Sequence, residues 1–102
     1  MAIQNTAVGT TATQLYSSSG NSAVVTIHLC NYTNSTVTAN LYIVPSGGTP
    51  NSSTIIYSNY SITSYNTLII NTEKFILGNG DKVYANVSTG SSVTATVSYI
   101  GI

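Results

Sequence analysis

The only histidine and the only cysteine of this sequence, His28 and Cys30, are the residues whose types and spacing best suit nucleophilic or metal chemistry. Residues two apart on an extended strand point to the same side, about 7 Å from each other. A cysteine nucleophile also needs its imidazole to be oriented by a third group, and zinc needs three or four ligands. The sequence supplies neither, so the pair is interpreted as part of a half-buried strand face.

The only carboxylates, Glu73 and Asp81, flank a Gly-Asn-Gly turn. A glycosidase needs two carboxyl groups at a defined separation, and calcium needs six to eight oxygen ligands. We expect each carboxylate to offset its neighbouring lysine, Lys74 or Lys82. The glycine pairs lack a following Gly-Lys-Ser/Thr and a helix, so they indicate turns and no phosphate loop. We therefore predict no catalytic residue, no metal ligand, no cofactor and no enzymatic activity.

Tyrosine is the aromatic residue of this chain, with eight Tyr, one Phe and no Trp. Tyr57, Tyr60 and Tyr65 fall in one polar stretch, and the alternation of their strands places Tyr42 and Tyr84 on an outer face. Tyrosine among Ser, Asn and Gly is typical of adaptable binding surfaces, and it is enriched at interfaces. Cross-strand aromatic packing within one sheet explains the same residues equally well. These five tyrosines are the candidate interface residues.

The scarcity of charge limits the possible functions. Only 4% of the residues are charged and the net charge is zero, whereas about 25% is typical. The polar residues are instead 15 Ser, 16 Thr and 11 Asn. Such a chain offers no electrostatic surface for nucleic acid or an anionic membrane, and little repulsion between copies. The 42% hydrophobic content argues against disorder.

Alternating apolar and polar residues indicate strands throughout the chain. In the first strong segment, Val25, Ile27 and Leu29 are expected on the buried face. A short strand or a single turn is expected at residues 73–77. The strong strand segments are 22–31, 36–44, 81–88 and 92–100, and the weaker ones are 11–16, 54–62 and 66–71.

Seven or eight short strands separated by turns predict an all-β fold, an antiparallel β-sandwich that resembles a jelly roll. The 102 residues suffice for one domain, which we place at residues 11–102. Residues 1–10 are expected to be an N-terminal arm that either lies across a neighbour or frays. One cysteine excludes an internal disulfide. No signal peptide is visible in the sequence and no apolar run approaches about 20 residues, so we expect synthesis in a cytoplasm.

Four segments, in an order that spans the chain, are VGTTATQLY at 8–16, AVVTIHLCN at 23–31, VTANLYIVPSGG at 37–48 and LGNGDKVYA at 77–85. Together they resemble small virion structural proteins of tailed bacteriophages, cyanophages among them. The resemblance implies a β-sandwich accessory component of the capsid surface, neck, tail or baseplate, without a catalytic motif.

We therefore expect a non-catalytic virion structural protein, foremost a capsid decoration or cement protein on the particle surface. Its expected partners are further copies of itself and other virion proteins, either major capsid or tail proteins, with no nucleic acid and no membrane. Its expected location is the virion, assembled in the host cytoplasm. Two alternatives stay open: a neck, tail or baseplate accessory protein, and a glycan-binding module that uses the surface of residues 57–65.

Overall fold

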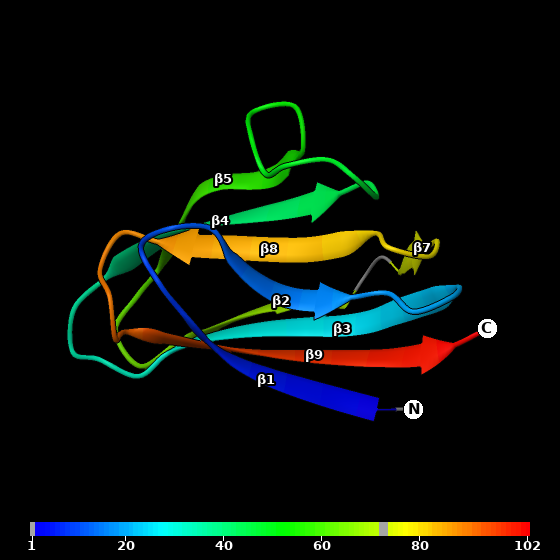
Figure 1. Ribbon diagram of the computed structural model, residues 1–102. Coiled ribbons are helices and arrows are strands. Elements are labelled where there is room, and N and C mark those ends of the chain that lie inside the picture. The colour runs from blue at the N-terminus through cyan, green and yellow to red at the C-terminus, as the bar shows by residue number, and fades with distance from the viewer. Residues whose placement is uncertain (1, 72–73) are drawn as a thin grey trace.

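The alternating segments fold into antiparallel strands, as the all-β prediction requires (Figure 1). The computed structural model describes residues 2–71 and 74–102. Those residues contain no helix that is long and apolar enough to cross a membrane. The strands are β1 (Ala2–Val8), β2 (Thr13–Ser17), β3 (Ser22–Asn31), β4 (Val37–Val44), β5 (Ile55–Ile62), β6 (Thr67–Ile70), β7 (Phe75–Leu77), β8 (Lys82–Val87) and β9 (Val93–Gly101).

The strands form two sheets that pack face to face. Sheet A has the order β1-β9-β3-β6, and β7 pairs with residues 22–24 at the start of β3. Sheet B has the order β2-β8-β4-β5. In Figure 1 sheet A is the lower layer, and both termini lie at one end of it. This order is that of a jelly roll in which β6 and β7 together occupy the place of one strand. The predicted antiparallel, jelly-roll-like sandwich is thereby confirmed.

The core lies between the sheets and contains one apolar face of each strong strand. Ile27 and Leu29 of β3 and Leu41 of β4 are completely buried. Burial of each such side chain stabilises the fold by roughly 1.5–3 kcal/mol. The prediction for Val25 is wrong: β3 has a bulge between Val24 and Thr26, so Val24 takes the buried position and Val25 is only half-buried. A bulge shifts the alternation by one residue, and the apolar pair Val24-Val25 permits either phase.

The N-terminal segment differs from the expected arm. Residues 2–8 form β1, which pairs with β9 over its full length, from Ala2 opposite Tyr99 to Val8 opposite Val93. In the described part of the chain the sandwich therefore has nine strands and not seven or eight, and it begins before residue 11. Of the β1 side chains only Val8 is buried, so the segment lacks a strong alternation. Backbone hydrogen bonds to β9 hold residues 2–8 in the sheet.

Asn31 holds two turns together at one end of the sandwich. Its side chain is completely buried, and its Nδ2 donates to the carbonyl oxygens of Ser35 at 2.8 Å and Ile62 at 3.0 Å. Its Oδ1 accepts from the backbone N–H and the hydroxyl of Thr33, at 3.0 and 2.7 Å. One amide thereby satisfies backbone groups of two segments that are about 30 residues apart in the sequence.

Candidate interaction surfaces

His28 and Cys30 lie in β3 on the outer side of sheet A, both half-buried. His28 is between Thr96 of β9 and Ile69 of β6, and Cys30 occupies the next cross-strand row. Among the described residues, no three His, Cys, Asp or Glu side chains gather in a way that could hold a metal ion. The half-buried position of both side chains on the outer side of β3 agrees with the interpretation of the pair as part of a strand face.

Asp81 is a structural residue of the turn that precedes β8. Its Oδ1 accepts from the Ser46 backbone N–H and its Oδ2 from the Gly78 backbone N–H, both at 2.8 Å. The carboxylate thus joins the 78–81 turn to the turn after β4. Glu73, the other carboxylate considered, lies outside the described residues. Lys82 directs its Nζ to the Gly80 carbonyl at 3.4 Å.

The outer side of sheet A, here called the sheet A face, exposes large apolar side chains. Ile3 is 67% exposed, Ile76 66%, Ile69 53% and Ile100 42%. They come from four different strands, and the strand register puts Ile76 and Ile100 on either side of Ala23. Exposed apolar residues that share one face mark interaction surfaces far more often than scattered ones do.

The strands that form the sheet A face carry no carboxylate, ammonium or guanidinium group. The strands of sheet A, all within the described residues, contain no Asp, Glu, Lys or Arg. Mostly small side chains lie between the isoleucines, and the half-buried imidazole of His28, beside Ile69, is a larger one among them. These small residues are Ala7, Ala23, Thr26, Cys30, Thr94, Thr96 and Ser98.

The outer side of sheet B, the sheet B face, carries two of the predicted tyrosines. Tyr42 of β4 and Tyr84 of β8 are directly opposite each other, half-buried, on the outer side as predicted. In the next row Asn40 donates through its Nδ2 to Asn86 Oδ1 at 3.0 Å, and the Tyr42 hydroxyl donates to the same oxygen at 3.4 Å. These side chains therefore contact one another across the strands, which is the packing alternative to an interface.

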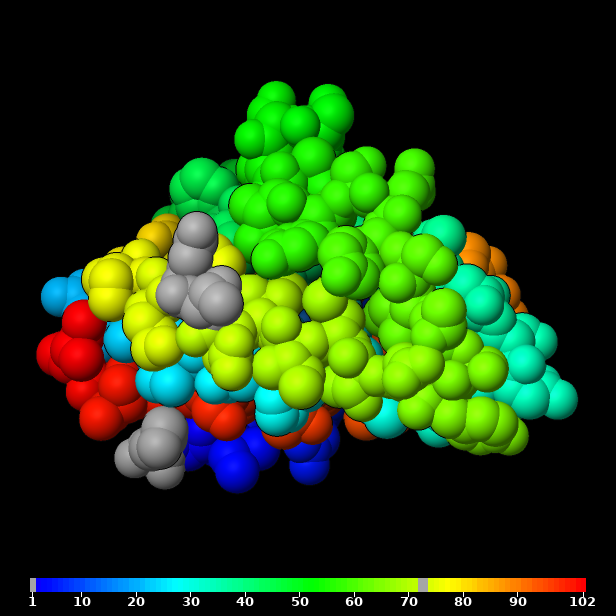
Figure 2. All heavy atoms as spheres, turned by 180° about the vertical axis from the view of Figure 1, so that it is seen from behind, coloured from blue at the N-terminus to red at the C-terminus, as the bar shows by residue number. Residues whose placement is uncertain are grey.

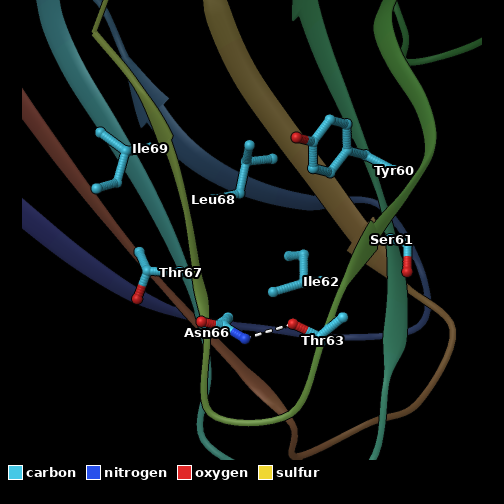
Figure 3. A pocket seen from close by; sticks show the side chains of 8 residues that line it. All are labelled: Tyr60, Ser61, Ile62, Thr63, Asn66, Thr67, Leu68 and Ile69. Carbon is cyan, nitrogen blue, oxygen red and sulfur yellow. Dashed lines mark hydrogen bonds between the residues drawn. The ribbon is translucent and has the colours of Figure 1, made fainter.

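A groove opens between β5, the edge of sheet B, and β6, the edge of sheet A. It has a volume of about 300 Å³, and Ile62 and Leu68 are among its lining residues, with the Tyr60 ring beside them (Figure 3). Polar groups surround it, including Thr67 and Asn66. Figure 2 shows this side of the molecule, with the green β5 segment above the yellow-green β6 segment.

The structure brings together only some of the tyrosines of the 57–65 stretch. The rings of Tyr57 and Tyr60 meet edge to face, with centroids 5.8 Å apart. Tyr57 also packs against the core, whereas Tyr60 is 45% exposed at the groove. Tyr65 is 70% exposed in the turn between β5 and β6, with a φ of 57°, and does not line the groove.

No family model, no curated protein and no solved structure matches this chain. The sheet A face was not predicted from the sequence, because its isoleucines come from segments far apart in the chain. One signal was present: Ile69 and Ile100 stand where the alternation of their strands calls for a polar residue.

Proposed function

We propose that this chain is a non-catalytic structural protein of a tailed-bacteriophage virion, where it decorates the capsid surface as a homo-oligomer. The observation that carries the proposal is the sheet A face, on which four exposed isoleucines share a surface whose strands contain no Asp, Glu, Lys or Arg. A protein that diffuses freely gains nothing from such a face, whereas one that is held between neighbours buries it.

The chemistry of this face suits a permanent contact with other proteins. Apolar area and neutral hydrogen bonds are little affected by salt, which screens charged contacts. The molecule measures 39 × 27 × 21 Å, so a broad face is of the size that a standard interface needs, about 800 Å² per partner. Copies repeated on a symmetric shell add avidity to a modest affinity per copy.

Two further arguments favour a virion. Jelly rolls are recurrent in viral capsid and lectin domains, although a fold by itself does not specify a function. The resemblance of the four sequence segments to phage virion proteins makes the particle the expected setting. The same face serves equally in a neck, tail or baseplate accessory protein, which is the alternative location.

Labelling of intact particles tests the proposal. Antibodies raised against the purified chain, visualised with gold on particles of the phage that encodes it, should decorate the capsid at many sites. Label confined to the neck, tail or baseplate would make the capsid location wrong and leave the structural role. Particles that carry no label, and that lack the chain by mass spectrometry, would refute the virion proposal.

The binding surface is tested separately, by adding purified chain to particles from which this chain has been removed and measuring how much rebinds. The double variant Ile69→Lys, Ile76→Lys should lose rebinding, because two buried ammonium groups oppose an apolar contact. A matched charge on the other face, Gln14→Lys, should rebind as the unmodified chain does. Equal rebinding by both variants would contradict the assignment of this face.

A second candidate function, glycan binding, is favoured by the groove between β5 and β6. An exposed tyrosine ring beside hydroxyl and amide groups suits a sugar, and about 300 Å³ is at the lower end of ligand-site volumes. Glycan-array binding by the purified chain that disappears in Tyr60→Ala and persists in Tyr65→Ala would support this function. An array without any bound glycan would refute it.

A further inference from the structure

The four open edges of the sandwich differ in how well they are protected against pairing with another strand. Proteins protect such edges with bulges, charges, prolines or very short strands. The β2 edge has a bulge between Gln14 and Tyr16. The β5 edge has two irregularities and a positive φ at Asn59. The remaining edge of sheet A is divided into two short strands, β6 and β7.

The fourth edge, β1, has none of these protections. It is seven residues long, it contains no proline and no charged residue, and its register with β9 is unbroken from Ala2 to Val8. Its φ angles include no positive value. Within the described residues β1 pairs with β9 alone, so alternate backbone N–H and C=O groups along its other side point outward.

We propose that β1 pairs antiparallel with β1 of a second copy of this chain, which joins the two A sheets into one continuous sheet. An antiparallel pair of identical strands has a two-fold axis, and full overlap of residues 2–8 puts that axis at Asn5. Ile3 then faces Ala7 of the second copy, and Gln4 faces Thr6 of the second copy. A two-fold contact of this kind is closed, so it ends at a dimer and does not propagate into a fibre.

The side chain at the axis is suited to this position. Asn5 is exposed, and its Oδ1 accepts from the Thr96 hydroxyl at 3.1 Å, which orients the amide along the sheet A face. An amide has two N–H donors and two acceptor lone pairs. Two Asn5 side chains across the axis therefore form reciprocal hydrogen bonds, and no charge has to be desolvated.

The dimer also enlarges the sheet A face. Because Ile3 lies next to the axis, pairing places the two sheet A faces side by side as one larger apolar surface. The inference names the partner in the proposed homo-oligomer but does not need the virion role. It is tested on the purified chain alone, so a failure of the dimer leaves particle labelling unaffected, and the reverse also holds.

Sedimentation of the purified chain tests the pairing. The unmodified chain should form a dimer, and Asn5→Lys, which places two ammonium groups face to face, should weaken dimerisation at least tenfold. Asn5→Glu should do the same, and an equimolar mixture of the two variants should dimerise again. Control charges on other edges, Gln14→Lys in β2 and Ser61→Lys in β5, should leave the dimer intact.

A crosslink checks the register. Directly opposed residues of an antiparallel pair have Cα atoms about 4.5–5.5 Å apart, within disulfide range. In a Cys30→Ser background, Asn5→Cys should form a disulfide-linked dimer under mild oxidation, and Ser61→Cys should not. A chain that stays monomeric at about 100 μM, or a dimer that Asn5→Lys leaves intact, would overturn the proposal.

Discussion

The two outer faces of the sandwich arise from the same alternation, yet their side chains differ in what they contact. On the sheet B face, Asn86 accepts hydrogen bonds from Asn40 and Tyr42, so the polar groups contact each other within the chain. On the sheet A face, isoleucines such as Ile76 extend into solvent. The first face contributes to the stability of the monomer, and the second is available for association.

The interior resembles the sheet B face in this respect, because its polar side chains are also paired. Within the described residues no buried side-chain nitrogen or oxygen lacks a hydrogen-bond partner. Polar groups are thus satisfied internally while apolar surface is left open. Changes to the polar contacts should lower the free energy of unfolding, whereas changes to the sheet A face should affect association.

The largest loss of stability is expected for Asn31→Ala. The substitution removes the amide that bonds the Ser35 and Ile62 carbonyls and the Thr33 N–H, so the free energy of unfolding should fall by about 3 kcal/mol. Urea denaturation measures it. The exposed neighbour Asn34→Ala should change it by less than about 0.5 kcal/mol. A loss below about 1 kcal/mol at Asn31 would contradict the structural role of the amide.

Gly80→Ala is expected to cost about 2 kcal/mol, because two effects combine. The residue has a φ of 86°, and an added Cβ would lie 2.5 Å from Ser46 Oγ. Gly20→Ala is the matched control, since Gly20 has a φ of 70° and a Cβ added there would meet no atom of a non-neighbouring residue within 4 Å. Gly20→Ala should therefore show the backbone effect alone, about 1 kcal/mol. Equal decreases of the melting temperature in both variants would mean that the contact with Ser46 is unimportant.

Asn86→Ala should lower the free energy of unfolding by about 1 kcal/mol, because Asn40 and Tyr42 lose the oxygen to which they donate. Thr94→Ala, at a half-buried position on the sheet A face, is the control and should stay within about 0.5 kcal/mol. The two losses, measured in parallel urea titrations, sharpen the contrast between the faces. Equal losses for Asn86→Ala and Thr94→Ala would contradict the difference between the two faces.

The smallest effect on stability is expected for Ile69→Thr and Ile76→Thr, within about 0.5 kcal/mol, because more than half of each side chain is already exposed to solvent. Retention on a hydrophobic-interaction column should nevertheless fall, since the exposed apolar area decreases. Ile62→Thr, at a position that is 2% exposed, should cost at least about 2 kcal/mol. A cost of that size at Ile76 would show that its side chain is packed and not free.

The sequence predicted the sandwich and most of its strands because the signal is local. The alternation of Leu41 and Val83 with Tyr42 and Tyr84 can be read directly, and it placed both tyrosines on an outer face. The role of Asn31 could not be read in this way, because its partners Ile62 and Thr63 are remote in sequence. The groove beside Tyr60 was likewise hidden, since it needs two strand edges to approach each other.

By itself, the sequence determined that this chain forms a neutral, two-layered β-structure, because period-two burial and the lack of charge are properties of neighbouring residues and of composition. Only the tertiary structure decided that residues 2–8 are an edge strand and that Ile3, Ile69, Ile76 and Ile100 share one face. The physical reason is that pairing between distant strands sets the register, and the register decides which side chains become neighbours.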